Sequence, residues 1–305
     1  MRDSEGRVFV VQGPTASGKT SLAISIAKRL GTEIISADSR QFYREMSIGT
    51  AKPTLDELRQ VKHHFIHSHS IREELTASGF AKEAKPVLDA LLKKNGSAVI
   101  VGGSGMFIDA LTLGLDEIPH DKSIQQRMTQ LFEKEGLDFI QEKLRELDPA
   151  YYEFVDRQNP VRLIRALEVI ELTGRPFSEL RKGTVHHNYQ MFRFGIQWKR
   201  PDLYKRIDDR VDLMMEEGLL NEAKGLFPQR NLKALNTVGY RELFSYWENE
   251  YSYEIAVEKI KQHTRNYAKR QLTWLKRYED MHYLDPYSLI SLEHQVSNRV
   301  TLSCS

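Results

Sequence analysis

A glycine-containing motif near the amino end constrains the fold of this chain more than any other feature. Residues 13–20 read Gly-Pro-Thr-Ala-Ser-Gly-Lys-Thr and match the pattern G-x-x-x-x-G-K-[ST]. A short apolar, β-branched run at 8–12 precedes the motif, and an amphipathic stretch with Leu22, Ile26 and Leu30 follows it. This order of strand, loop and helix is the context in which the motif binds a di- or triphosphate.

The residue types of the loop suit an anion. Glycines let backbone N–H groups converge on a phosphate, and the following helix adds the partial positive charge of its amino end. Lys19 supplies a point charge for the terminal phosphate, and Thr20 supplies a hydroxyl for a magnesium ion. We therefore expect the phosphate-binding residues to be Gly13, Pro14, Thr15, Ala16, Ser17, Gly18, Lys19 and Thr20.

Further strands and helices alternate along the chain. Apolar runs at 33–37 and 98–101 predict buried strands, and the periodicity of 80–94 predicts a helix between them. Strand-like alternation returns at 191–198, and a short apolar run lies at 282–284. Strands alternating with helices predict an α/β fold with a parallel sheet.

One internal stretch breaks this rhythm. From about residue 118 to residue 182 only helical periods occur, including a helix over 161–173. We therefore expect a P-loop parallel-sheet core at 1–117 and 189–305, with long charged helices towards its end, and an all-helical insertion domain at 118–188.

Composition excludes several classes of protein. A length of 305 residues, 28% charged residues and a mean hydropathy of −0.50 indicate about two globular domains. The most apolar run, 97–115, is broken by glycines and by Asp109, and no signal peptide is visible. The lone cysteine, Cys304, excludes disulfides and Cys-based zinc sites and favours a cytoplasmic setting. The net charge of +2 neither requires nor excludes nucleic acid.

An acidic residue follows the second predicted strand. P-loop hydrolases hold their magnesium with an acid at the end of a later strand, but 98–101 ends in glycines and Ser104. Asp38 instead lies after 34–35, where ligands gather in a parallel sheet. It could be a general base, an outer magnesium ligand or a helix cap. The arrangement favours group transfer over a motor or switch ATPase, and Gln41 could pair with an adenine edge.

Taken together, these strings resemble the tRNA dimethylallyltransferase family. That family moves an isoprenyl group from dimethylallyl diphosphate onto the exocyclic N6 amine of adenosine 37 in tRNA. The resemblance covers about residues 8–285. Eukaryotic members of the family add a C-terminal zinc finger, and this chain lacks the cysteines for one, so the resemblance implies the bacterial type. The strings that carry it are 13–20, 38–43, 48–53, 101–105, 162–168, 206–207 with Arg210, 238–240, and 264–265 with 268–271.

Two positions depart from the family pattern. Ser104 stands where threonine is usual, which keeps the hydroxyl. His67 and His69 stand where acids are common, within a run that also contains His63 and His64. Four close histidines could suggest a metal site, but side chains of an extended run alternate in direction, which argues against one.

The resemblance implies a set of catalytic residues. An aromatic amine is a poor nucleophile, so the departing diphosphate must be strongly stabilised, which a P-loop with Mg²⁺ does without hydrolysis. By analogy, Arg210 would reach the diphosphate, Asp38 would take the amine proton and Thr20 would bind Mg²⁺.

The resemblance also implies tRNA as partner, with the insertion domain gripping the anticodon stem-loop and the enzyme acting as a monomer away from membranes. A basic run at 259–277 contains no acid; it predicts either a phosphate footprint or a solvated helix face. The implied tRNA-binding residues are Asp38, Ser39, Arg40, Gln41, Ser104, Arg127, Val161, Arg162, Leu163, Ile164, Arg165, Arg265, Lys269 and Arg270.

Two other functions fit the motifs. A small nucleoside or metabolite kinase also combines a P-loop with a helical lid, and would phosphorylate its substrate from ATP without RNA. An RNA-binding P-loop protein could instead use nucleotide hydrolysis as a switch. Transfer of label from dimethylallyl diphosphate to tRNA, without ATP, separates the three hypotheses.

Overall fold

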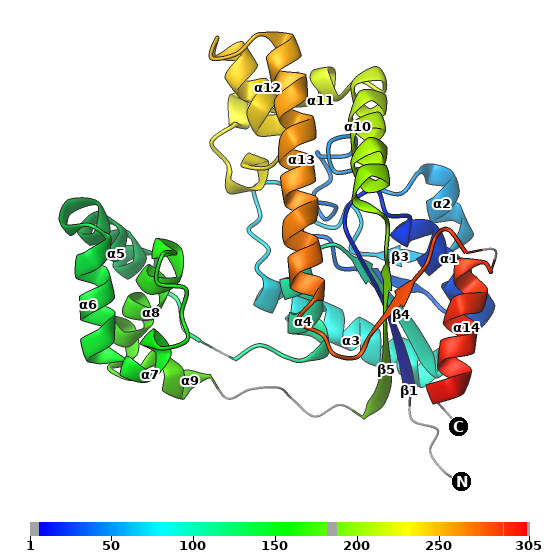
Figure 1. Ribbon diagram of the computed structural model, residues 1–305, viewed down its shortest axis with the longest axis horizontal. Coiled ribbons are helices and arrows are strands. Elements are labelled where there is room, and N and C mark those ends of the chain that lie inside the picture. The colour runs from blue at the N-terminus through cyan, green and yellow to red at the C-terminus, as the bar shows by residue number, and fades with distance from the viewer. Residues whose placement is uncertain (1–5, 117, 182–187, 289, 304–305) are drawn as a thin grey trace. The chain divides into compact units, whose positions relative to one another are not determined.

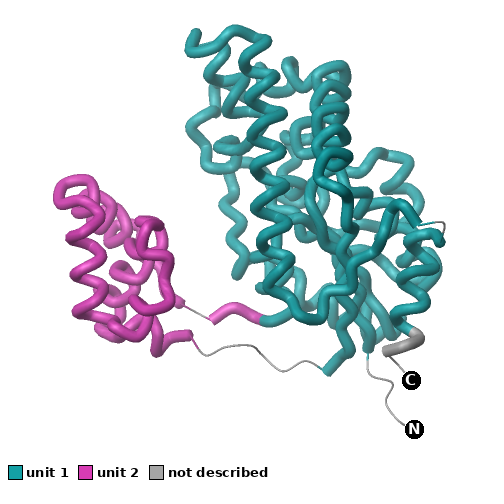
Figure 2. Tube along the Cα trace, in the orientation of Figure 1, with its two compact units in different colours: residues 1–113, 186–305 teal, residues 114–185 magenta. Residues whose placement is uncertain are grey.

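A computed structural model describes residues 6–116, 118–181, 188–288 and 290–303. The lone cysteine, Cys304, and the expected boundary residue 117 lie outside the described residues. The chain divides into two compact units, residues 1–113 with 186–305 and residues 114–185 (Figure 2). We call the first the core unit and the second the helical unit.

The core unit contains a six-stranded sheet in which every neighbouring pair is parallel, in the order β3-β2-β4-β1-β5-β6. The α/β prediction is therefore confirmed. The strand β3 is short and pairs with Ile34 and Ile35. The strands are β1 (Gly6–Gln12), β2 (Ile34–Ser36), β3 (His63–His64), β4 (Ser97–Gly102), β5 (Tyr189–Ile196) and β6 (Met281–Leu284).

Helices cover both faces of this sheet. Val8 and Val10 of β1 pack towards Phe80 and other residues of α3 (Ala77–Asn95), together with α4 (Gly105–Thr112). The alternate residues Phe9 and Val11 pack towards α1 (Lys19–Leu30) and α14 (Leu292–Ser303). Successive side chains of a strand point to opposite faces, so a strand covered on both sides reads as a continuous apolar run.

A second layer of helices lies beyond the carboxyl ends of the strands (Figure 1). Its core includes Val211, Leu219, Tyr240 and Ile260. The layer closes over the strand ends and so shapes the pocket described below. Its elements are α10 (Arg200–Glu216), α11 (Leu219–Leu226), η1 (Phe227–Gln229), η2 (Lys233–Leu235), α12 (Tyr240–Trp247) and α13 (Tyr253–Leu275), while the short α2 (Leu55–Gln60) precedes β3.

The helical unit has a hydrophobic core of its own, with Met128, Ile140, Leu144 and Leu163 at its centre. The carboxylate of Asp121 caps its first helix by accepting from two backbone N–H groups. Its described residues 118–181 contain helices and no strand. They are α5 (Lys122–Glu135), α6 (Leu137–Leu147), α7 (Pro149–Tyr152), α8 (Pro160–Thr173) and α9 (Phe177–Leu180).

Candidate active site

The phosphate-loop motif joins β1 to α1 in the core unit, as its sequence predicts. Ala16 (φ 61°) and Gly18 (φ 92°) both adopt left-handed backbone conformations. Such conformations within a turn make a concave nest of backbone N–H groups that binds anions. For the alanine this conformation costs roughly 1–2 kcal/mol, so the surrounding contacts must hold it in place.

Lys19 lies over this loop, and its Nζ donates a hydrogen bond to the Pro14 carbonyl at 2.7 Å. Burial lowers the pKa of Lys19 to about 8; the Asp38 carboxylate opposes this shift, whereas the Arg210 guanidinium adds to it. The ammonium is therefore poorly compensated by protein charge, which favours a bound anion. Among the described residues the buried Ser17 hydroxyl in the same loop has no hydrogen-bond partner.

Asp38 lies just beyond the carboxyl end of β2, in the position expected from the sequence. Its Oδ1 accepts a hydrogen bond from the Arg40 N–H at 3.2 Å. The turn is fixed to the end of β4 because the Ser39 N–H donates to Ser104 Oγ at 3.0 Å. Ser104, at a position where the resemblance noted above leads us to expect threonine, thus uses the hydroxyl that both residue types share.

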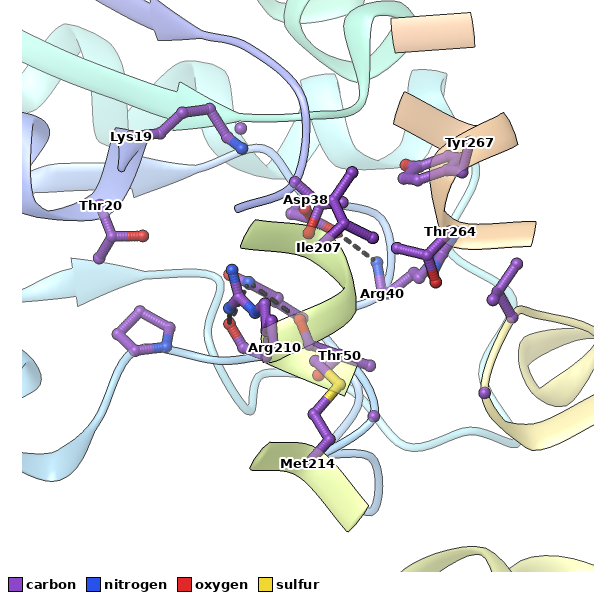
Figure 3. Close-up of a pocket in the computed structure, with 18 of the residues that line it drawn as sticks. Lys19, Thr20, Asp38, Arg40, Thr50, Ile207, Arg210, Met214, Thr264 and Tyr267 are labelled. Atoms are coloured by element: carbon purple, nitrogen blue, oxygen red, sulfur yellow. Dashed lines mark hydrogen bonds between the residues drawn. The ribbon is translucent and has the colours of Figure 1, made fainter. Parts of the chain in front are cut away.

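One pocket of about 980 Å³, measured with its open mouth, is lined by residues of both segments, among them Lys19, Asp38 and Arg40. Lys19, Thr20 and Arg210 lie on one side of it, and Tyr267 of α13 lies on the other (Figure 3). Asp38 lies between the two groups in this view. The pocket therefore brings a carboxylate and an anion-binding loop to one site.

Arg210 and Gln41 meet at one backbone oxygen. The Ala51 carbonyl accepts from Arg210 Nη2 at 3.1 Å and from Gln41 Nε2 at 3.1 Å. Gln41 Nε2 also donates to the Thr50 carbonyl at 3.2 Å. Because its N–H groups are used in this way, the atom of the Gln41 amide left for a ligand is the acceptor Oε1, which can pair with an N–H donor. Burial lowers the pKa of Arg210, and Asp38 opposes that shift.

The loop that carries this oxygen is held from behind by α11. The Glu222 carboxylate accepts hydrogen bonds from the N–H groups of Ser47, Ile48 and Gly49 at 2.8 to 3.0 Å. Gly49 is needed here, because a Cβ at this position would lie 2.7 Å from the ring of Tyr240. Glu222 was not among the residues expected from the sequence, because it lies in a segment without a recognisable motif.

The long helix α13 contributes the wall opposite the loop. The Tyr267 ring stacks against the Arg40 guanidinium, 4.2 Å from its centroid. Gln271 Oε1 accepts from the Thr15 N–H at 3.0 Å, and Gln271 Nε2 donates to the Gly103 carbonyl at 3.0 Å. Both residues were missed as site residues, although Gln271 belongs to one of the strings that carry the family resemblance.

The basic run on α13 is partly neutralised by acids of another helix. Arg265 pairs with Asp208 of α10 at 2.5 Å, and Lys261 pairs with Asp212 of α10 at 2.7 Å. The run contains no acid of its own, but two of its charges are thus compensated by acids of α10. The exposed basic side chains of the run, for which the described residues provide no ion pair, are Lys269, Arg270, Lys276 and Arg277.

The tRNA-binding residues expected in the helical unit differ in their exposure to solvent. Val161 and Arg162 are exposed at the start of α8, whereas Leu163 and Ile164 have their side chains in the unit's core. Arg165 donates to the Ile118 carbonyl at 3.1 Å and pairs with the buried Glu168 at 2.8 Å.

Arg127 of α5 also belongs to the expected tRNA-binding set. Its side chain is 57% exposed and pairs with Glu171 of α8.

The four neighbouring histidines have four different partners. His63 contacts the Val61 carbonyl at 2.9 Å, and His64 pairs with Glu33 at 2.7 Å. His67 Nδ1 lies 2.9 Å from the Nζ of Lys52, and His69 pairs with Glu83 at 3.3 Å. Each imidazole is thus part of a separate contact.

Comparison with known proteins identifies the family. The sequence profile described as "IPP transferase" matches residues 41–278, more than three quarters of the chain. The chain belongs to the IPP transferase family. Its relatives in the family include the tRNA dimethylallyltransferase of Christiangramia forsetii, 48% identical over 90% of this chain and 91% of that protein. The enzyme of the same name from Flavobacterium psychrophilum is 44% identical over 91% of this chain and 93% of its own.

Solved structures agree with this membership. The tRNA isopentenylpyrophosphate transferase of Bacillus halodurans superposes with a TM-score of 0.71 at 32% identity, covering 98% of this chain and 96% of that one. A eukaryotic dimethylallyltransferase acting on tRNA superposes with a TM-score of 0.79 at 26% identity, covering 97% of this chain and 77% of that one. Among the described residues of this IPP transferase family member, no helix is long and apolar enough to cross a membrane.

The donor atoms beside the loop suit magnesium in a family that acts on diphosphates. The Thr20 hydroxyl and the Asp38 carboxylate, both hard oxygen donors, line the same pocket. Mg²⁺ usually keeps several waters and shares phosphate oxygens with its substrate, so few protein ligands are required. The described residues contain no group of three or more His, Cys, Asp or Glu that could hold a metal. The residues present therefore fit an ion held mainly through a bound diphosphate.

Proposed function

We propose that this protein transfers the dimethylallyl group from dimethylallyl diphosphate to the exocyclic N6 amine of adenosine 37 in tRNA and releases diphosphate. One observation carries the proposal beyond family membership: the Asp38 carboxylate shares its pocket with Lys19, Thr20 and Arg210. A carboxylate and an anion-binding loop that line one pocket support a reaction in which a base and a leaving-group site act together. We further propose that the enzyme works as a monomer in the cytoplasm.

The phosphate loop stabilises the leaving group in this proposal. As the allylic C–O bond breaks, its electron pair goes to the diphosphate, whose negative charge grows. Lys19 and Arg210 supply positive charge at this point, and the nest of backbone N–H groups in residues 13–20 supplies further donors. The Thr20 hydroxyl would help to hold Mg²⁺, whose chemistry there would be Lewis-acid stabilisation of the same charge.

Asp38 acts as the general base. When the N6 nitrogen forms its bond to the allylic carbon, it must lose a proton, and a carboxylate can accept it. The hydrogen bond from the Arg40 N–H to Oδ1 fixes the orientation of the carboxylate, which leaves Oδ2 for the proton. Gln41 Oε1 would accept a hydrogen bond from the second N6–H group and so orient the amine.

The RNA reaches the pocket with its base out of the stack, as enzymes acting on single bases generally require. We propose that Ser39, Arg40, Gln41 and Ser104 contact the flipped nucleotide near Asp38. Lys269 and Arg270, with Arg265 beside them, would bind phosphates, and the helical unit would grip the anticodon stem-loop. Within that unit the exposed Arg127 and Arg162 would make the side-chain contacts.

A transfer assay tests the function. Purified enzyme is incubated with Mg²⁺, unmodified tRNA transcript and dimethylallyl diphosphate labelled in the prenyl group. The proposal predicts label on tRNA without ATP, and none on a transcript in which guanosine replaces adenosine 37. ATP-dependent phosphorylation of a small molecule, with no label on tRNA, would instead support the kinase hypothesis.

A further inference from the structure

Two side chains outside the motif bind successive carbonyl groups of the phosphate loop. Arg206 Nε donates to the Ala16 carbonyl at 2.9 Å. Trp198 Nε1 donates to the Ser17 carbonyl at 3.0 Å. The Arg206 guanidinium also stacks on the Trp198 ring, 4.3 Å from its centroid, so the two donors form one unit.

Both donors have packing contacts of their own. Trp198 follows β5 and lies with its ring edge-on to Tyr287, with 5.4 Å between ring centroids. Arg206 belongs to α10, whose Leu203 and Ile207 pack with Ala16 in a small buried cluster. The loop is therefore held from two elements that are more than 180 residues away in the sequence.

A trans peptide unit directs its carbonyl and its N–H group to opposite sides. Binding of the Ala16 and Ser17 carbonyls therefore fixes the directions of the N–H groups of Ser17 and Gly18. These groups belong to the turn with left-handed Ala16 and Gly18, the geometry of an anion nest.

We propose that Arg206 and Trp198 are positioning residues that preorganise the phosphate loop for diphosphate, acting through the backbone carbonyls and not by contact with the substrate. The inference rests on the proposed function for the identity of the anion. Arg210, one helical turn after Arg206, donates to the Ala51 carbonyl of the facing loop. The same face of α10 thus sets the positions of both loops that border the pocket.

Two conservative variants separate positioning from direct binding. Trp198→Phe keeps an aromatic ring beside Arg206 and Tyr287 but removes the N–H donor to the Ser17 carbonyl. Arg206→Lys keeps the positive charge but loses the planar guanidinium. Lys205→Gln is the matched control, because Lys205 lies on the same helix, is 75% exposed and pairs with Asp209 at 2.8 Å.

The experiment measures the Kd of inorganic diphosphate with Mg²⁺ by isothermal titration calorimetry, together with the Kd of unmodified tRNA and the kinetics of transfer. Loss of one hydrogen bond to the loop should weaken diphosphate binding about threefold to tenfold in Trp198→Phe, and about tenfold in Arg206→Lys. The KM for dimethylallyl diphosphate should rise in parallel, while the Kd of tRNA and the values for Lys205→Gln stay within about twofold of wild type.

Other outcomes overturn the inference. A folded Trp198→Phe variant with unchanged diphosphate affinity would overturn it. A loss of diphosphate affinity in Arg206→Lys alone would instead indicate that Arg206 binds diphosphate directly. A parallel loss of tRNA and diphosphate affinity would indicate a general structural role. If Trp198→Phe does not fold, a crystal structure of Arg206→Lys decides the question. An altered phosphate loop would support positioning, and an unaltered loop with weakened diphosphate binding would overturn it. Failure of wild-type enzyme to prenylate tRNA would contradict the proposed function and leave the diphosphate comparison intact.

Discussion

The Oε1 of Gln271 accepts a hydrogen bond from the Thr15 N–H at 3.0 Å, which joins the long helix α13 directly to the phosphate loop. The amide nitrogen of the same side chain donates to the Gly103 carbonyl. One buried amide therefore connects the loop that would hold diphosphate, the turn after β4 and the helix that carries Lys269 and Arg270.

This connection predicts a specific effect of Gln271→Met, which keeps the length of the side chain and removes both hydrogen bonds. The KM for dimethylallyl diphosphate should rise about tenfold, because a buried backbone N–H and a carbonyl lose their partners. Gln262→Met, at an exposed position of the same helix, serves as control. Steady-state kinetics with each substrate varied in turn check the prediction, and an unchanged KM would show that the amide has no part in shaping the loop.

Replacement of the proposed base tests the chemistry itself. Asp38→Asn keeps the size of the side chain and an oxygen to accept from the Arg40 N–H, but the amide cannot take the amine proton. The rate constant of single-turnover transfer should fall about a hundredfold or more. The Kd of tRNA should change much less. Asp56→Asn, at a position that is 87% exposed, is the control, and a rate near wild type in Asp38→Asn would remove Asp38 from the mechanism.

The lowered pKa of Lys19 predicts how diphosphate affinity depends on pH. Burial lowers this pKa to about 8 from its ordinary value of 10.5, so the free enzyme loses the ammonium as pH rises through about 8. Affinity for diphosphate should therefore be highest below pH 8 and fall above it, and bound anion should raise the pKa.

Two arginine variants identify the group responsible for this change. Lys19→Arg should remove the fall, because a guanidinium stays charged throughout this range. Burial also lowers the pKa of Lys52 to about 8. The variant Lys52→Arg should nevertheless show the same dependence of diphosphate affinity on pH as the wild-type enzyme. Calorimetric titrations of inorganic diphosphate between pH 7 and about pH 9.5 test this. Persistence of the fall in Lys19→Arg would assign it to another group.

The exposed basic residues of α13 should determine how tRNA affinity depends on salt. Removing one cation that binds a phosphate reduces the slope of log K against log salt by about 1, so Lys269→Gln with Arg270→Gln should reduce it by about 2. Lys261→Gln is the matched control, because Lys261 is 16% exposed and already paired with Asp212. Filter-binding measurements over a range of salt concentrations check the slopes. Equal slopes in the double variant and wild type would place the RNA elsewhere.

The sequence predicted the features whose causes are local or periodic. The loop at 13–20 has its own motif, and the strands β1 and β4 are continuous apolar runs because helices cover both faces of the sheet. Asp38 could be placed near Lys19 because the carboxyl ends of parallel strands meet at one edge.

Contacts between distant segments could not be predicted in this way. Gln271 and Thr15 are separated by 256 positions, and no pattern in either segment indicates their hydrogen bond. Asp208 pairs with Arg265 across two helices, so a run without acids proved to be partly neutralised. The helix α14 packs on α1 through Val296 within a segment whose hydrophobic pattern is weak.

The stoichiometry of diphosphate release tests the central claim most directly, since the loop is proposed to hold a leaving group. Enzyme, unmodified tRNA and dimethylallyl diphosphate are mixed with Mg²⁺, and inorganic diphosphate and prenylated adenosine are quantified from the same samples, with and without ATP. The account predicts one diphosphate for each prenylated adenosine and no consumption of ATP. Consumption of ATP with no prenylated adenosine would contradict it.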